Sequence, residues 1–577
     1  MLRRLLPLVV FLAAALPPLG ALARPCGQAA PCGAITLEGP IPTPFPAGDP
    51  SANPNIPGGG RPVEGLAQPT VEEEFFFGGS VDVFNYDAFP AFRGDHPGDR
   101  LVAYYKPGQP MVPQPYKTRM LVRRPATADA FSGDVVIESM NSTAGFDSTP
   151  VWLPSAEYFA REGIVYIGVS TSGSQSIPFL KPHPQFPGGP VTGCGGINPP
   201  CGTRYATLQM SDNGQEYELI NQLVTALKSG DLSQIPLPAD FGPVQHVFFS
   251  GQSQQGGSII THASQFHFSG IDGYFFMGAS GVRAIRGGFS SAALGLDLTS
   301  RTCGTGTGTS AALPYPNCVA PLTGLEVRVR TDLPAPVYRG SSETDIGNGT
   351  TRQDDTDTSP FASFRLIEVP ATAHNVVHKS PLPFPGLPPG FTIGDLCLNL
   401  PYTMADGPIF GNHVWNAMWE NLRIQVTQGV RPPYAPRVLI AGGVISRDSF
   451  QNAKGGVRLP ELDVPTNSYF LPNNFGKPAC VPPQTPADSP CVPSALAGLG
   501  GLACFLSGSL APLPQPTLNM LYSNHGSYVS RIAHRANVLV KARFLLPEDA
   551  ELHKTAAGES EFGQGGRPRA VRRAAAR

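Results

Sequence analysis

An apolar strand that turns sharply into a helix constrains this chain more than any other feature. The run His246-Val-Phe-Phe-Ser250 leads into Gly251-Gln-Ser-Gln-Gln-Gly256, and a helical pattern continues from Ser258. Ser253 therefore lies on the turn, where a tight backbone exposes its hydroxyl. A serine hydroxyl becomes a strong nucleophile only when a base accepts its proton and suitable donors stabilise the oxyanion. The sequence thus predicts Ser253 as a candidate nucleophile.

Short apolar strands alternating with helices surround this turn. Besides the strand before Ser253, strands are expected at 117–123, 134–139, 164–169, 271–277, 335–340 and 364–369, and helices at 154–161, 216–228, 414–425 and 528–544. Apolar strands joined by helices form a mostly parallel sheet that helices cover on both faces. The fold class is therefore α/β. Pro- and Gly-rich insertions at 175–203, 283–325 and 375–412 are expected to line the pocket.

The last two of these strands run into acidic and basic side chains. The strand at 335–340 is followed by Glu343 and Asp345, and the strand at 364–369 is followed by His374. The carboxyl ends of parallel strands meet at one edge of the sheet, so these groups can approach the serine turn. His374 would accept the serine proton, and Asp345 would hold the imidazole in the productive tautomer. Glu343 stays open as an alternative acid.

Two donors are expected to bind the oxyanion. The first is the backbone N–H of Gln254, where the helix after the turn begins. The second comes from residues 140–142, after the strand at 134–139, where Asn141 also carries a side-chain amide. This scheme needs no cofactor and no metal.

Other candidate groups are interpreted differently. His374 and His378 have the spacing of a zinc pair, but Asn375 replaces the glutamate base of the His-Glu-x-x-His motif. The acidic stretch Arg352–Asp357 lacks the glycine that turns a calcium loop and is interpreted as a solvated turn. Ser280 precedes no clear helix. His262 and His267 are expected to be packing or surface residues.

The two ends of the chain carry different signals. Residues 1–23 combine a basic start, an apolar stretch and Ala21-Leu-Ala23, which is typical of a cleaved signal peptide. We expect an extended leader at 24–70, one domain with a C-terminal extension at 71–552, and a disordered tail at 553–577. An exported chain would work as a secreted or periplasmic protein.

The ten cysteines all follow the expected cleavage site, and export makes disulfides the first interpretation. Proximity in the sequence suggests the pairs Cys26–Cys32, Cys194–Cys201, Cys303–Cys318 and Cys480–Cys491, which leaves Cys397 for Cys504. Zinc is the competing interpretation, but the chain has no Cys-x-x-Cys motif. The apolar stretch 496–513 contains glycines and Cys504, so it is expected to be a buried loop and not a membrane span. A formal net charge of −2 gives no basic face for nucleic acid.

Several of these motifs, taken in order, resemble the alpha/beta-hydrolase domain family called alpha/beta-hydrolase family 10, a family of secreted bacterial esterase-like proteins. The resemblance covers about residues 70 to 552 and rests on 116–125, 141–146, 251–254, 271–273, 330–332 with 342–345, 364–374 and 455–460. It implies an α/β-hydrolase core, Ser253 as nucleophile and His374 as base. It favours Asp345 as the acid without excluding Glu343.

One position departs from this pattern. Two residues after the serine, such turns normally carry a small residue, whereas this chain has Gln255. Gly256 and Gly257 follow directly and are expected to let the helix pack closer.

The sequence therefore predicts a serine carboxylic-ester hydrolase that works through an acyl-enzyme. Its substrate would be a small or polymeric ester, and export makes an extracellular ester or polyester a candidate. Two alternatives stay open: a catalytically silent binding protein on the hydrolase fold, and a metal-dependent hydrolase that uses His374 and His378.

Overall fold

The fold is known from a computed structural model, which describes residues 24–28, 30–41, 63–86, 101–103, 113–142, 147–173, 176–180, 205–279, 329–330, 332–347, 349, 352–374, 397, 411–473, 476 and 504–560. The expected signal peptide and most of the three expected insertions lie outside these residues. So do the cysteine pairs 194–201, 303–318 and 480–491.

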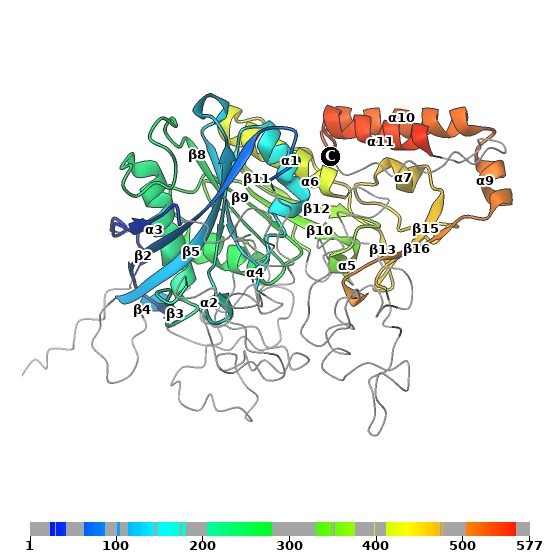
Figure 1. The fold of residues 1–577 in the computed structure, drawn as a ribbon. Helices are drawn as coiled ribbons and strands as arrows, with labels where there is room; N and C mark the ends of the chain where they lie inside the picture. The colour runs from blue at the N-terminus through cyan, green and yellow to red at the C-terminus, as the bar shows by residue number, and fades with distance from the viewer. Residues whose placement is uncertain are drawn as a thin grey trace, which may run out of the picture.

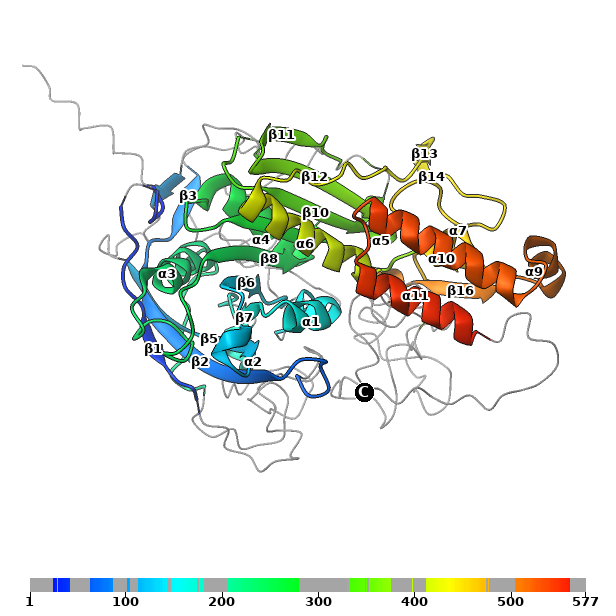
Figure 2. The same cartoon turned by 90° about the horizontal axis from the view of Figure 1, so that it is seen from above.

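One large twisted sheet forms the centre of the molecule (Figures 1 and 2). Its ten strands follow the order β1-β2-β5-β7-β6-β8-β9-β10-β12-β11. The strands from β7 to β12 run parallel and are β7 (Val165–Val169), β6 (Asp134–Ser139), β8 (His246–Gln252), β9 (Gly273–Met277), β10 (Val337–Ser342) and β12 (Ala362–Val369). Almost every residue of these strands is buried, as expected for parallel strands covered on both faces.

Antiparallel strands complete both edges of this sheet. On one side lie β5 (Gln114–Pro125), β2 (Thr70–Val81) and β1 (Thr36–Glu38), and on the other lies β11 (Thr356–Ser359). The sequence indicated β5 but not β2, which pairs with β5 along its whole length. Arg123 and Arg124 of β5 bind Glu72 and Glu73 of β2 at 2.6 and 2.8 Å.

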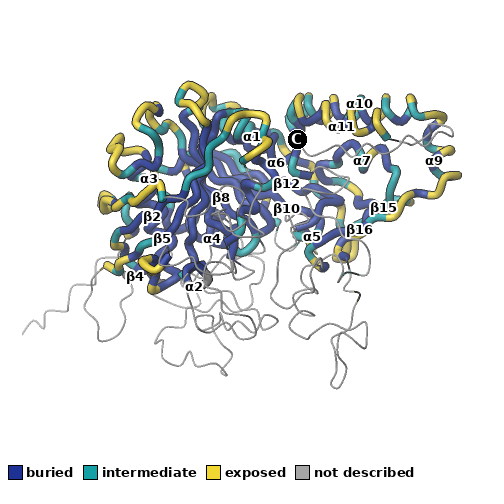
Figure 3. Tube along the Cα trace, viewed as in Figure 1, coloured by how far each residue is buried: buried dark blue, intermediate teal, exposed yellow. Residues whose placement is uncertain are grey.

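Alternate strand residues face two separate cores. One core joins Val135, Ile137 and Phe249 to α3 (Gln215–Ser229) and α4 (Gln254–Thr261). The other joins Val136 and Phe248 to α1 (Trp152–Arg161) and α6 (Asn412–Gln428), and it contains all three tryptophans of the chain. The two-residue alternation of the strands thus gives both sheet faces a helical cover, and the burial colouring of Figure 3 shows the resulting interior.

The C-terminal part forms an extension beside the sheet (Figure 1). It comprises β13 (Ile440–Ala441), β14 (Val444–Ile445), α7 (Pro460–Asp463), β15 (Asn467–Phe470), β16 (Ser509–Pro512), α9 (Gln515–Leu521), α10 (His525–Lys541) and α11 (Pro547–Glu559). Ala536 and Leu539 of α10 belong to the same core as the buried residues of α1 and α6. The sequence indicated α10 but missed α11, which continues to Glu559 past residue 553, where a disordered tail was expected. Residues 561–577 lie outside the described part.

Two disulfides occur among the described cysteines, and both match the expected pairs. Cys397–Cys504 ties the extension to the segment between β12 and α6, and Cys504 is fully buried. Cys26–Cys32 closes a short loop of the leader against α3.

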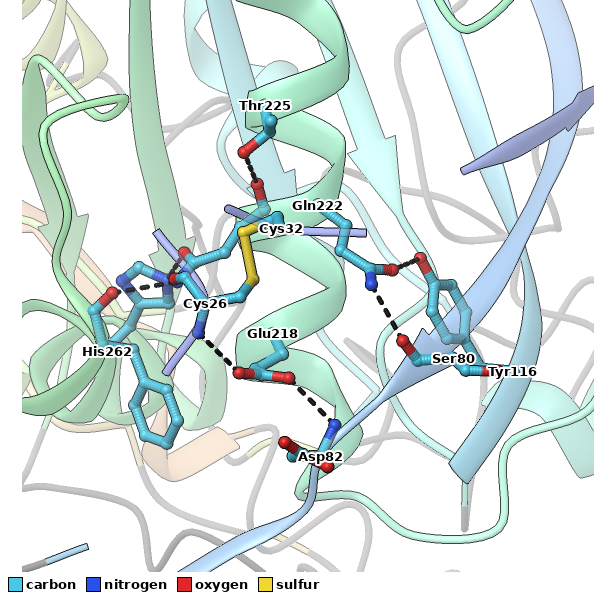
Figure 4. The surroundings of a disulfide bond; sticks show 11 residues. Cys26, Cys32, Ser80, Asp82, Tyr116, Glu218, Gln222, Thr225 and His262 are labelled. Carbon is cyan, nitrogen blue, oxygen red and sulfur yellow. Dashed lines mark hydrogen bonds between the residues drawn. A yellow bond between two sulfur atoms is a disulfide. The ribbon is translucent and has the colours of Figure 1, made fainter. Parts of the chain in front are cut away.

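The leader is bound more firmly than a Pro- and Gly-rich composition suggests (Figure 4). Glu218 of α3 accepts hydrogen bonds from the backbone N–H groups of Cys26 at 2.7 Å and Asp82 at 2.9 Å. Gln222, one turn later, donates to the carbonyl of Ser80 and accepts from the hydroxyl of Tyr116. One face of α3 therefore holds the leader and the antiparallel edge together.

The remaining short elements are β3 (Phe84–Tyr86), β4 (Leu101–Ala103), α2 (Ser176–Leu180), α5 (Glu343–Ile346), η1 (Ala128–Ala130) and η2 (His262–Phe266), which continues α4. No helix in the described part of the chain is long and apolar enough to cross a membrane.

Candidate active site

Ser253 lies on the turn between β8 and α4, as the sequence predicts. Its backbone has φ 59° and ψ −116°, a conformation that residues other than glycine rarely adopt. The Ser253 N–H donates to the carbonyl of Met277 at the end of β9, at 2.9 Å, and the Ser253 carbonyl accepts from Gly257 N–H at 3.2 Å. Both bonds hold the strained backbone, which is typical of functional positions.

Two glycines and one buried glutamine make this turn possible. A Cβ on Gly251 would lie 2.9 Å from the backbone of Gln255, and a Cβ on Gly256 would lie 2.9 Å from Cβ of Ala279. Gln255 is fully buried, and its side-chain amide donates to Oγ1 of Thr171, just beyond β7, at 3.2 Å. The side chain of Gln255 is thus accommodated beside the end of β7, and Gly256 allows the close contact with the end of β9.

Asp345 and His374 meet at the same edge of the sheet. Asp345 lies in α5 after β10, His374 follows β12, and Asp345 Oδ1 lies 2.5 Å from His374 Nδ1. The second oxygen of Asp345 accepts from the N–H of Ser342 at 2.9 Å and from its hydroxyl at 2.6 Å. The N–H of His374 donates to Oγ1 of Thr344 at 2.7 Å. Backbone and carboxylate together fix the orientation of the imidazole.

The end of β9 brings His374 to the serine turn. Met277 accepts the N–H of Ser253, and the next residue, Gly278, lies directly against the His374 ring. Gln252, immediately before Ser253, also contacts His374, because its side-chain nitrogen lies 3.1 Å from Nε2. His374 therefore contacts Gln252, which precedes Ser253, and Gly278, which follows the residue that binds the Ser253 backbone.

The two partners shift each other's pKa in opposite directions. Burial disfavours the ionised carboxylate, but the charge of His374 and the hydrogen bonds outweigh burial and lower the pKa of Asp345. Burial also disfavours the imidazolium, but the charge and hydrogen bond of Asp345 outweigh it and raise the pKa of His374. The pair therefore favours an ionised Asp345 and a more basic His374.

Glu343, the alternative acid, faces a different group. Its carboxylate accepts from Arg447 at 2.6 Å and from the N–H of Ala371 at 2.7 Å. Burial raises its pKa, against the opposing charge of Arg447. Arg447 comes from the C-terminal extension, and nothing in the sequence indicated that it would contact Glu343.

Asn141 lies beside the turn, and its side-chain amide points to Gln252. It donates to the Gln252 carbonyl at 2.9 Å and lies 3.4 Å from its side-chain oxygen. Its backbone N–H donates to the Ser148 carbonyl, and the N–H of Met140 donates to Val169. The Asn141 side chain thus holds the residue that precedes Ser253. Gln254 begins α4, and its side-chain oxygen accepts from the hydroxyl of Ser142 at 3.2 Å. Residues 143–146 lie outside the described part.

The other candidates are placed elsewhere. His262 is fully buried, with its Nε2 2.9 Å from Asn221 and its Nδ1 3.2 Å from the Tyr274 hydroxyl, and burial lowers its pKa. Burial likewise lowers the pKa of His267 to about 4. Both histidines are packing residues that contact Tyr274, as expected from the sequence.

The acidic stretch before β12 is held by arginines. Asp355 binds Arg437 and Asp357 binds Arg365, each at 2.7 Å. Ser280 and His378 lie outside the described residues. Within the described residues, no group of three or more His, Cys, Asp or Glu side chains is arranged to hold a metal ion.

Gly278→Ala should lower kcat about 100-fold, because an added Cβ would lie 2.8 Å from both Cε1 and Nδ1 of His374 and would displace the imidazole. The positive φ of 62° at Gly278 adds backbone strain. Steady-state kinetics would measure the loss. Gly230→Ala is the matched control, since Gly230 also has a positive φ, of 74°, and no atom lies within 4 Å of its added Cβ. Equal activity of the two variants would contradict the proposed contact.

The fold and the strained serine turn define the class of protein: an α/β-hydrolase. The chain belongs to the alpha/beta hydrolase domain family, whose pattern matches residues 52–554. No match is found among curated proteins.

The solved structures that the chain matches include a glucuronoyl esterase from Solibacter usitatus (10% identity, 55% of this chain and 80% of that chain, TM-score 0.24). An esterase B from Lactobacillus rhamnosis, inhibited by a tributyrin phosphonate, is 13% identical over 43% of this chain and 69% of that chain, with TM-score 0.21. A fungal esterase from Rhizomucor miehei is 12% identical over 48% of this chain and 67% of that chain, with TM-score 0.21.

Proposed function

We propose that this protein is a secreted serine hydrolase of carboxylic esters. The observation that carries the proposal is the contact of His374 with Asp345 on one side and with the strained Ser253 turn on the other. Membership of the α/β-hydrolase family agrees with this chemistry. The signal-peptide pattern of residues 1–23 and the two disulfides among the described cysteines support export.

In the proposed mechanism, Ser253 Oγ attacks the ester carbonyl carbon while its proton passes to Nε2 of His374. Asp345 stabilises the resulting imidazolium. The backbone N–H of Gln254 and a donor of the 140–142 segment bind the oxyanion, and the side chain of Asn141 positions the turn. The imidazolium then protonates the leaving alcohol as the ester C–O bond breaks. Water, deprotonated by His374, hydrolyses the acyl-enzyme and restores Ser253.

Labelling with a fluorophosphonate probe tests this mechanism directly. The full chain should be labelled stoichiometrically, and mass spectrometry should place the adduct on Ser253. A panel of esters graded by acyl length and aromaticity, together with an insoluble polyester, would then define the substrate. Failure of both labelling and turnover would instead favour a silent binding protein. Activity that a chelator removes and the probe does not would favour a metal-dependent hydrolase.

The rate should also depend on pH through His374. Only the neutral imidazole can accept the serine proton, and Asp345 raises its pKa. We therefore expect kcat/KM to fall as the pH is lowered through a value above 6.5, the ordinary pKa of histidine. The profile of kcat/KM against pH checks this, with protein stability monitored at each pH. An activity loss centred below 6.5 would contradict it.

A further inference from the structure

Gln252, the residue before the candidate nucleophile, makes a contact that the mechanism above does not use. It is the last residue of β8, and its side chain is buried between Asn141 and His374. Its side-chain nitrogen lies 3.1 Å from the His374 carbonyl oxygen and 3.1 Å from His374 Nε2. Nε2 is the atom that must accept the proton of Ser253, so Gln252 lies at the reacting end of the base.

Two neighbours fix which end of the Gln252 amide faces His374. The His374 carbonyl can only accept a hydrogen bond, so the group opposite it must be the amide NH₂. The side-chain nitrogen of Asn141 can only donate, and it lies 3.4 Å from the Gln252 side-chain oxygen. A flipped amide would set oxygen against oxygen and nitrogen against nitrogen. The NH₂ group of Gln252 therefore faces Nε2.

This orientation determines the protonation of the imidazole. An N–H that points at Nε2 needs a lone pair there, so Nε2 is unprotonated. The proton of the neutral ring is then on Nδ1, where Asp345 accepts it. Gln252 and Asp345 thus select the same tautomer from opposite sides of the ring, and that tautomer is the one a general base requires.

We propose that Gln252 is a positioning residue that holds His374 as the Nδ1-protonated neutral base and opposes its protonation at Nε2. The proposal rests on the proposed function. Among the described residues, the charged group against the ring is Asp345 of α5, and Arg339 of β10 acts on Asp345 in turn. Gln252 of β8, Thr344 of α5 and Gly278 after β9 are the uncharged neighbours.

The contact also has a consequence during the reaction. When the Oγ–H bond of Ser253 breaks and an Nε2–H bond forms, two N–H groups would face each other, so the hydrogen bond between Gln252 and Nε2 must open. The bond from Gln252 to the His374 carbonyl can persist. Gln252 therefore competes with Ser253 for one lone pair and makes the resting base weaker than Asp345 alone would make it.

Replacing Gln252 by Leu tests this competition, since Leu fills similar space and has no donor. The acid limb of the profile, where kcat/KM falls as the pH is lowered, should move to higher pH by about 0.5 to 1 unit. This is the shift expected for the loss of one hydrogen bond to the neutral ring. Gln252→Glu should move it further, because a carboxylate at Nε2 favours the imidazolium. The pH profile of fluorophosphonate labelling should shift by the same amount.

Gln255→Leu is the matched control. It removes a buried glutamine from the same turn, but that side chain bonds to Thr171 and not to His374. It should lower Tm without moving the acid limb. A limb that does not move in Gln252→Leu, or that moves equally in both variants, would overturn the proposal.

A measurement on the unmodified chain covers the case in which Gln252→Leu does not fold. In protein labelled with ¹⁵N-histidine, the His374 signals above the acid limb should show a protonated Nδ1 and a hydrogen-bonded, unprotonated Nε2. The opposite tautomer would overturn the proposal. Absence of probe labelling and turnover in the wild type would refute the proposed function instead, and the tautomer would still test the role of Gln252.

Discussion

Ser253→Ala is expected to reduce ester turnover at least about 10⁴-fold and to abolish fluorophosphonate labelling, while the chain stays folded. The variant removes the protein atom that attacks the ester carbonyl and that the probe labels. It keeps a Cβ, so the backbone strain at φ 59° changes little, and Tm should stay close to that of the wild type. Turnover of an activated ester and thermal unfolding would measure both effects.

Ser258→Ala controls for the loss of a serine hydroxyl in α4, the helix that follows Ser253. The Ser258 hydroxyl donates to the buried carboxylate of Glu216 in α3 at 2.9 Å. This variant should lose stability, by about 1 kcal/mol, and retain labelling. Turnover near the wild-type level in Ser253→Ala would refute Ser253 as the nucleophile.

Asp345→Asn should lower kcat by roughly 10³- to 10⁴-fold, the second largest effect expected. An amide at this position would either donate to Nδ1 or fail to stabilise the imidazolium, so the base would lose the tautomer that leaves Nε2 free of a proton. The hydrogen bonds from Ser342 can still be accepted by the amide oxygen, so the fold should be retained. Kinetics across pH should show the loss at every pH.

Glu343→Gln separates the two acids that the sequence left open. Its carboxylate is buried against Arg447, so the variant leaves a guanidinium without its charge partner and should destabilise the fold by about 1 to 3 kcal/mol. Its kcat should fall far less than that of Asp345→Asn. The reverse order of the two kcat values would make Glu343 the acid.

Much of the fold follows from local patterns. The parallel strands are continuous apolar runs, and the turn glycines and the order of Ser253, Asp345 and His374 can be read along the chain. The strand β2 was missed because Glu72, Glu73 and Glu74 give it an acidic, exposed-looking start. Their partners are arginines of β5, some fifty residues away in sequence, and such pairing is not visible locally.

The helix α11 was missed for a related reason. It buries polar groups, among them Asp549 and His553, so it has no continuous apolar stripe. His553 Nε2 lies 3.1 Å from Nδ1 of His413 in α6, and His553 Nδ1 lies 2.5 Å from Oε1 of Glu461 in α7. These partners are brought to His553 only when the chain folds. The contact of Gln252 with His374 is equally non-local, since it depends on the side-chain conformation at a turn. Local sequence therefore indicates where the candidate groups lie, and tertiary contacts decide how they are oriented.

The attachment of the C-terminal extension bears on how small a working version of this protein can be. Arg447 neutralises Glu343, two residues before Asp345, and the Val438 N–H donates to Glu368 of β12, six residues before His374, at 2.8 Å. A chain cut after α6 would keep Ser253, Asp345 and His374. It would, however, leave two buried carboxylates without these partners, Glu343 in the helix that carries Asp345 and Glu368 on the strand before His374. A shortened version of this protein would therefore have to keep the extension together with the sheet.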